Sequence, residues 1–96
     1  VGSSDLPVLV DFWAPWCGPC RAMTPVIKAA AQALGQSVRV AKVNTEAENE
    51  LASRFAIRSI PTLAIFHQGR IIGQRSGAMD LTRLSAWVRE VTEQVV

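Results

Sequence analysis

Two cysteines, Cys17 and Cys20, are the residues of this chain best suited to chemistry, and only Gly18 and Pro19 separate them. The thiolate rather than the thiol is the nucleophile, so the pair is reactive only where the fold stabilises a sulfur anion. An apolar run over residues 8–12 precedes the cysteines and a segment of helical period follows them, which puts them where a strand leads into a helix. The first helical turn has unpaired N–H groups and the positive end of the helix dipole. We therefore expect Cys17 to be exposed, acidic and nucleophilic, with Cys20 shielded one turn further in.

Two plainer interpretations of the cysteine pair are a static structural disulfide and one half of a zinc site. The zinc site lacks ligands, because structural zinc needs four and His67 is the only imidazole in the sequence. Pro19 suits the first helical turn, where its missing N–H had no partner. The spacing therefore favours redox chemistry, with Gly18 and Pro19 as the pair that tunes it.

Composition excludes several classes of function. Ninety-six residues with 49% apolar side chains suffice for one domain with its own core. A net charge of +2 without a Lys/Arg block argues against nucleic acid and membrane surfaces as partners. No apolar run approaches the ~20 residues that span a bilayer, and residues 1–4 show no signal-peptide pattern. We expect a single domain over residues 1–96 in the cytoplasm, although a start at Val1 leaves a processed form open.

The elements around the cysteines predict an α/β fold. Residues 8–13 are almost all apolar, as in a central strand covered on both faces, and residues 20–34 have helical spacing that ends at Gly35. Residues 38–44 give a second strand, which the intervening helix makes parallel to the first. We therefore expect one βαβ unit at the start of the fold.

A short helix and a ββα unit follow. Residues 45–48 have capping-box spacing and predict that the short helix begins there. Strands at 63–66 and 71–75 flank the turn signal Gln68-Gly69, so they form an antiparallel hairpin. Asp80 is placed to cap the last helix, with a buried stripe that continues to Val95. The predicted sheet is four-stranded and mixed, with helices on both faces.

Asp11 is the one charged residue in the first apolar strand. A lone acid there can face a polar pocket or pair with Lys42, and the spacing alone does not choose between these roles. Desolvation of a buried carboxylate raises its pKa.

The segment of residues 10–20, VDFWAPWCGPC, resembles the active-site segment of the thioredoxin family. The similarity continues in family order through residues 40–44, 57–62, 68–69 and 76–78, and it covers the chain from about Pro7 to the end. Residues 43–48 with Arg54 and Phe55 are most similar to the bacterial branch that carries an extra N-terminal zinc-binding segment, which is not in this chain. The family's usual first strand and helix are also missing. The resemblance implies an N-terminally short domain of thioredoxin-like fold whose strand at 38–43 is a sheet edge open to self-association.

The resemblance implies a protein-disulfide reductase active in cell redox homeostasis and electron transport. Cys17 would attack a target disulfide and Cys20 would resolve the mixed disulfide. The partners implied are disulfide-containing proteins and thioredoxin reductase, an NADPH-dependent flavoprotein, while the chain itself holds no cofactor. Gly18-Pro19 resembles the reducing members of the superfamily, whereas oxidases and isomerases usually have histidine in this dipeptide.

The resemblance also assigns roles to residues beyond the cysteines. Asp11 becomes a buried proton acceptor for Cys20, modulated by Lys42. A cis Ile60-Pro61 bond would expose the Ile60 backbone to an extended substrate segment. An apolar substrate-binding rim is implied around Cys17, formed by Trp16, Ile60, Pro61, Gly77 and Ala78. Trp13, Met23 and Trp87 are expected to pack inward.

Two rival functions stay open from the sequence. One is a disulfide oxidase or isomerase in an oxidising compartment. The other is a docking subunit whose cysteines are incidental to its function.

Overall fold

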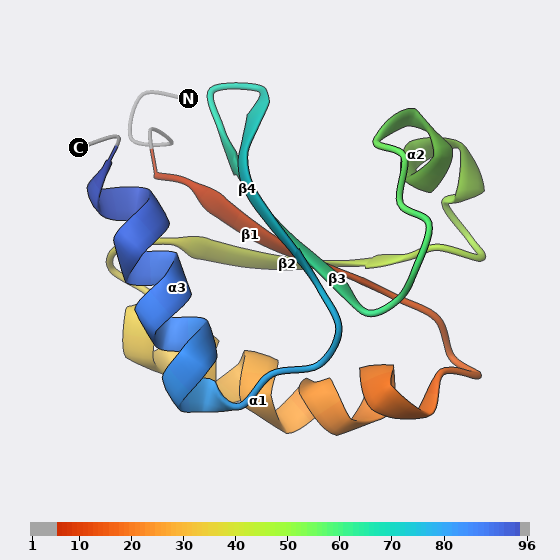
Figure 1. Ribbon diagram of the computed structural model, residues 1–96, viewed down its shortest axis with the longest axis horizontal. Coiled ribbons are helices and arrows are strands. Elements are labelled where there is room, and N and C mark those ends of the chain that lie inside the picture. The colour runs from red at the N-terminus through yellow and green to blue at the C-terminus, as the bar shows by residue number, and fades with distance from the viewer. Residues whose placement is uncertain (1–5, 95–96) are drawn as a thin grey trace.

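Four strands form one mixed sheet in the computed structural model, which describes residues 6–94 (Figure 1). The strand order is β2-β1-β3-β4, with β1 parallel to β2 and antiparallel to β3, and β3 antiparallel to β4. The strands are β1 (Val8–Trp13), β2 (Arg39–Asn44), β3 (Thr62–His67) and β4 (Arg70–Ser76). The helices are α1 (Gly18–Leu34), α2 (Asn49–Arg54) and α3 (Leu81–Glu93).

The predicted βαβ unit and hairpin are both confirmed. Helix α1 connects the parallel strands β1 and β2, and β2 lies at one edge of the described sheet, as expected. Gln68 and Gly69 have φ angles of 54° and 79°, the positive values that a two-residue turn between twisted strands requires. The predictions that concern residues 1–5 and Val95 fall outside the part of the chain that the structure describes.

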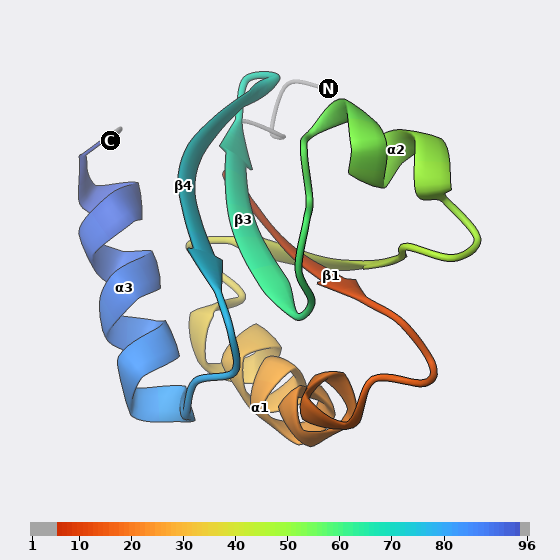
Figure 2. The same ribbon diagram turned by 45° about the vertical axis from the view of Figure 1, so that its right-hand side comes forward.

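The main core lies between the sheet and the helices α1 and α3, which cover the same face (Figure 2). Strand residues point alternately to opposite faces, so Leu9 of β1 contributes to this core while its neighbour Val10 does not. Met23 and Trp87 are buried here, as predicted. The buried members of this core are Leu9, Met23, Ile27, Ala30, Leu34, Val38, Leu63, Ile65, Leu84, Trp87 and Val88.

The opposite face of the sheet has a smaller core under α2 and the segment that follows it. Val10, Phe12 and Ala64 are buried there, with Ile57 packed against them. The Phe55 ring meets the Phe66 ring edge to face at 5.0 Å between centroids. Helices therefore flank both faces of the sheet, as the predicted fold class requires.

Two of the helix ends follow the sequence signals. Asp80 caps α3, because its Oδ1 accepts a hydrogen bond of 2.8 Å from the Arg83 backbone N–H. Gly35 follows α1, and a Cβ at this position would lie 2.8 Å from the Ala31 carbonyl oxygen, so the close approach of the backbone favours glycine.

The capping box predicted at residues 45–48 is wrong. Helix α2 begins at Asn49, and its N-cap Glu48 lies three residues after the predicted cap Thr45 and makes no side-chain cap. The Thr45 hydroxyl, which the box would direct at the helix, instead donates to the Trp13 carbonyl at 3.1 Å. The Asn44 side chain forms a turn by accepting from the Glu46 N–H at 2.9 Å. Contacts with another strand and a local turn therefore replace the expected first helical turn.

Candidate active site

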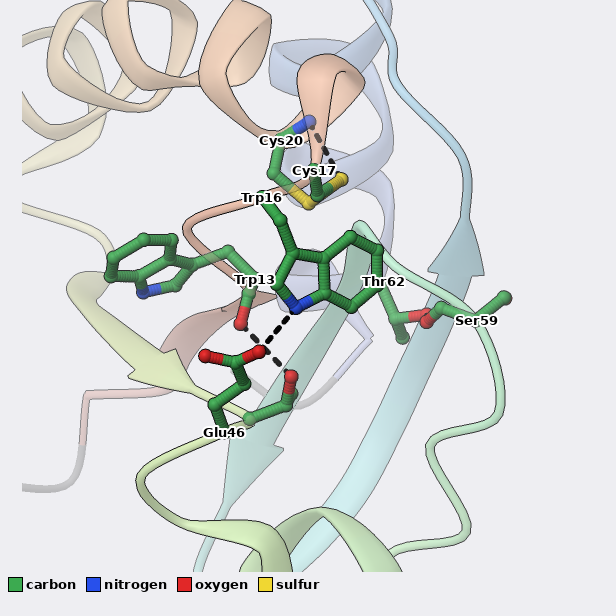
Figure 3. The surroundings of a disulfide bond; sticks show 8 residues. Trp13, Trp16, Cys17, Cys20, Glu46, Ser59 and Thr62 are labelled. Carbon is green, nitrogen blue, oxygen red and sulfur yellow. Dashed lines mark hydrogen bonds between the residues drawn. A yellow bond between two sulfur atoms is a disulfide. The ribbon is translucent and has the colours of Figure 1, made fainter.

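Cys17 and Cys20 form a disulfide at the N-terminus of α1, with 5.2 Å between their Cα atoms (Figure 3). Cys17 is the N-cap residue, and its Sγ accepts a hydrogen bond of 3.1 Å from the Cys20 backbone N–H. One of the unpaired donors of the first turn is thus directed at the Cys17 sulfur. Gly18 and Pro19 form the start of the helix between the two cysteines and are exposed. This geometry favours the anionic form of Cys17 once the disulfide is reduced.

The expected contrast between an exposed Cys17 and a shielded Cys20 is wrong for the disulfide form. Cys17 is 5% exposed and Cys20 2% exposed. Both pack with Ala14 in one cluster, against which Trp13 and Ile60 also lie. Both side chains are covered by the same small apolar cluster, so position along the helix does not separate their exposure.

Asp11 lies on the same side of the sheet as the helix that carries the cysteines. It alternates with Val10 and Phe12 of the smaller core, and its cross-strand partner Leu63 belongs to the core under α1 and α3. Its side chain is fully buried, and neither carboxylate oxygen has a hydrogen-bond partner among the described residues. Desolvation by this burial raises the pKa of Asp11 above its ordinary value, and the positive charge of Lys42 opposes the shift. No described residue therefore hydrogen-bonds to these oxygens in the way that the polar pocket considered from the sequence would require.

Lys42 acts on Asp11 through its charge. The two residues are direct neighbours across the parallel strands β1 and β2. The Lys42 Nζ lies 4.8 Å from the centroid of the Trp13 ring, a cation–π contact. Trp13 is half-buried and packs against the cysteine cluster, so this contact links β2 to the packing around the disulfide.

The loop before β3 faces the same cluster. The Ile60-Pro61 peptide bond is cis, as predicted, and Ile60 packs against the cysteines. The Thr62 hydroxyl donates to the Ser59 carbonyl at 2.6 Å and closes this loop (Figure 3). The Gly77 N–H donates to the Pro61 carbonyl at 2.8 Å, which brings Gly77 and its neighbour Ala78 to the loop. Four of the five predicted rim residues therefore come together from two separate loops.

Trp16, the fifth rim residue, is held by a partner that sequence reasoning missed. Its side chain is 67% exposed, and its indole Nε1 donates to the Glu46 carboxylate at 2.5 Å (Figure 3). The turn that carries Glu46 is itself anchored, because the backbone N–H of Thr45 donates to the Trp13 carbonyl at 2.8 Å. A charge-assisted hydrogen bond thus fixes a large exposed ring beside Cys17. The available signal was Asn44, two residues before Glu46, which is typical of a side-chain-capped turn.

Metal-ligating clusters and membrane-spanning helices are both absent from the described residues. In residues 6–94 no group of three or more His, Cys, Asp or Glu side chains could hold a metal ion. Within that same range, none of the helices has the length and apolar character that a bilayer crossing demands.

A disulfide at a helix N-terminus, beside a cis-proline loop and on a β2-β1-β3-β4 sheet, defines a thiol-disulfide oxidoreductase of thioredoxin-like fold. The family model described as Thioredoxin matches residues 1–90. The chain belongs to the thioredoxin family and, with its Cys17–Cys20 pair, is a protein-disulfide reductase.

Relatives from distant organisms support the assignment. Thioredoxin 1 of the cyanobacterium Nostoc sp. is 52% identical over 82 residues, which are 85% of this chain and 77% of that protein. Thioredoxin of Porphyra purpurea is 48% identical over 84 residues, 88% of this chain and 78% of the relative. The crystal structure of the germline-specific thioredoxin Deadhead from Drosophila melanogaster matches with a TM-score of 0.85 at 30% identity, over 93% of this chain and 84% of that one. Membership implies, in general terms, disulfide-containing protein substrates and reduction by a thioredoxin reductase.

Proposed function

We propose that Cys17 is the attacking thiolate and Cys20 the resolving thiol of this reductase. In the dithiol form, the Cys17 thiolate attacks one sulfur of a target disulfide, forms a mixed disulfide and releases the other target sulfur as a thiolate. Cys20 then loses its proton and attacks the Cys17 sulfur, which releases the second target thiolate. Two electrons pass to the target, and the Cys17–Cys20 disulfide is formed. The observation that carries the assignment is the Cys20 N–H donated to the Cys17 sulfur at the helix N-cap.

Asp11 is the proton acceptor for Cys20 in this proposal. A carboxylate whose pKa is raised by burial is a stronger base than an exposed one and is therefore better suited to take the proton of a thiol. Its position on the α1 side of the sheet and its lack of hydrogen-bond partners support this role. Lys42 tunes it, since its charge favours the ionised carboxylate. Gly18 and Pro19 tune the cysteines by shaping the first helical turn.

The substrate lies across the rim formed by Trp16, Ile60, Pro61, Gly77 and Ala78. An extended segment of the target pairs with the backbone near Ile60, and its side chains rest on the apolar rim. The exposed Trp16 ring and the bond between the Gly77 N–H and the Pro61 carbonyl support this arrangement. The recharging partner is an NADPH-dependent flavoprotein thioredoxin reductase. Residues 1–96 act as one domain in the cytoplasm, where the chain maintains redox homeostasis.

Trapping of substrates tests the division of labour. A Cys20→Ser variant keeps the attacking thiolate but lacks the resolving thiol, so it is expected to accumulate as a covalent adduct with disulfide-containing proteins. The adducts are counted on non-reducing gels and released by dithiothreitol. The matched Cys17→Ser variant is expected to form none. If Cys17→Ser accumulates adducts and Cys20→Ser does not, the assignment of the attacking and resolving cysteines is reversed.

A further inference from the structure

A groove of about 460 Å³ runs between the end of β4 and helix α3, next to the proposed substrate rim. The groove is lined by Arg75, Ser76, Ala78, Met79, Arg83, Ala86, Trp87 and Glu90. Figure 2 shows α3 beside β4, and the Arg75 guanidinium of β4 lies over the Trp87 ring of α3. Ala78 belongs both to this lining and to the proposed rim, so a bound segment can extend from one into the other.

Two backbone N–H groups connect the redox site to the end of the groove that lies nearest the substrate rim. The Gly77 N–H donates to the Pro61 carbonyl at 2.8 Å. The Met79 N–H donates to the Met23 sulfur at 3.4 Å, and Met23 lies on α1 one turn after Cys20. The loop between β4 and α3 is therefore tied both to the cis-proline loop and to the helix of the disulfide.

Two arginines contribute positive charge to the end of the groove that lies nearest the substrate rim. The Arg75 guanidinium lies over the buried Trp87 ring at 5.5 Å from its centroid, and one of its N–H groups donates to the Gln74 carbonyl at 3.2 Å. The other N–H groups of this guanidinium are donors of the kind that bind a carboxylate. Arg83, in the first turn of α3, is exposed, and no ion pair to its guanidinium is described within residues 6–94.

Two acids lie near these arginines, and Asp80, which is outside the groove lining, is the one at the same end of α3 as Arg83. The Asp80 carboxylate caps α3 by accepting from the Arg83 backbone N–H. Glu90 lies seven residues further along α3 than Arg83, roughly 10 Å at the helical rise, towards the far end of the groove. Two arginines therefore face one carboxylate, Asp80, at the end of the groove nearest the rim, which leaves that end with a net positive charge, while Glu90 lies towards the other end.

We propose that this groove binds an acidic side chain of the disulfide-containing substrate, close in sequence to the target cysteine. The proposal rests on the proposed function, since it extends the same rim. Ala78, Met79 and Ala86 offer an apolar floor for the stem of a glutamate, and Arg75 and Arg83 bind its carboxylate. The groove thus makes the reductase prefer substrates whose cysteine is followed or preceded at short distance by Asp or Glu.

Charge reversal on both partners tests the proposal. Matched peptides that contain one disulfide and carry Glu, Gln or Lys near one cysteine are reduced in single turnovers by the pre-reduced full chain. The Glu peptide is expected to react about two- to fivefold faster than the Gln peptide at low salt, the range of an exposed ion pair, and the Lys peptide slowest. The differences should shrink in 0.5 M NaCl because salt screens exposed charges.

Arg83→Glu is expected to invert the order, so that the Lys peptide reacts fastest. The substitution spares the helix cap, which uses the Arg83 backbone N–H and not its side chain. The matched control is Arg89→Glu, also exposed on α3 but outside the groove, and it should keep the original order. If the three peptides are reduced in the same order of rates by the unchanged chain, Arg83→Glu and Arg89→Glu, the groove assignment is overturned. No reduction of any peptide by the unchanged chain would instead overturn the proposed function, and the groove assignment with it.

Discussion

Replacement of Asp11 by Asn is expected to make the protein more stable at neutral pH and slower as a reductase. The carboxylate is fully buried in β1 and neither oxygen has a hydrogen-bond partner among residues 6–94. Placing one ion in such a site costs several kcal/mol. A buried amide without partners still costs about 1–3 kcal/mol, so part of the penalty persists in the variant. After the attraction of Lys42 is also deducted, we expect a net gain of about 1–3 kcal/mol at pH 7.

The pH dependence of this gain follows from the direction of the pKa shift. Burial raises the folded-state pKa of Asp11 above its unfolded value. Below the unfolded value the carboxyl is protonated in both states, and its contribution to stability is fully present. Between the two values only the folded state keeps the proton, so stability falls as pH rises through this window, and above the folded pKa the loss is constant. The advantage of Asp11→Asn should therefore be small in acid, grow with pH and then level off.

Urea unfolding of the oxidised chain and of Asp11→Asn across this pH range measures the effect. Glu93→Gln, which removes an exposed acid from α3, is the matched control and should stay within about 0.5 kcal/mol of the unchanged chain. In the reductase reaction, Asp11→Asn should prolong the lifetime of the mixed disulfide by up to about 100-fold near pH 7, with the deficit shrinking at high pH, where Cys20 ionises unaided. An Asn variant that is less stable than the unchanged chain at pH 7, and that resolves mixed disulfides at an unchanged rate, would refute the reasoning.

The loops and helix ends around the site give further expectations. Glu46→Ala should free the Trp16 ring, change its fluorescence and raise KM for protein substrates severalfold. The rate at which the variant reduces a small aromatic disulfide should change little. Glu46→Gln, which keeps an acceptor oxygen, should recover most of the affinity for protein substrates. An unchanged KM in Glu46→Ala would remove Glu46 from substrate positioning. Asp80→Ala should lower the free energy of unfolding by about 1 kcal/mol through loss of the α3 cap, while Asp80→Ser loses only a fraction of this, as read from urea midpoints. Equal midpoints for the two Asp80 variants would contradict the capping role.

Features with a local cause were predictable from the sequence. The apolar run of β1, the helical spacing of α1, the Gln68-Gly69 turn and the Asp80 cap each depend on residues close together in the chain. Asp11 stood out for the same reason, as one acid among apolar neighbours. The cis Ile60-Pro61 bond was predicted only through the family resemblance, since proline alone does not select the isomer.

Features that need distant segments to meet were missed. Trp16 and Glu46 are 30 positions apart, and although Asn44 indicates a turn next to Glu46, the local sequence does not indicate that the turn meets Trp16. The predicted capping box does not form in this turn, because the side chains of Thr45 and Asn44 make their hydrogen bonds outside the expected helix. Cys17 was expected to be exposed from its place at a helix end, but Ile60 and Trp13 arrive from other elements and pack against the cysteine cluster. Local patterns specify the elements, whereas the surroundings of the disulfide depend on how the elements pack.

Reduction of insulin disulfides by the full chain is the most direct test of the central claim. The reaction is followed by oxidation of NADPH in the presence of a bacterial thioredoxin reductase, with Cys17→Ser and Cys20→Ser as matched controls. The chain is expected to turn over repeatedly, with NADPH consumption that depends on both the reductase and insulin, and each variant should reduce this rate to background. A chain that is not recharged by the reductase, or a Cys17→Ser variant that still reduces insulin at the full rate, would contradict the account.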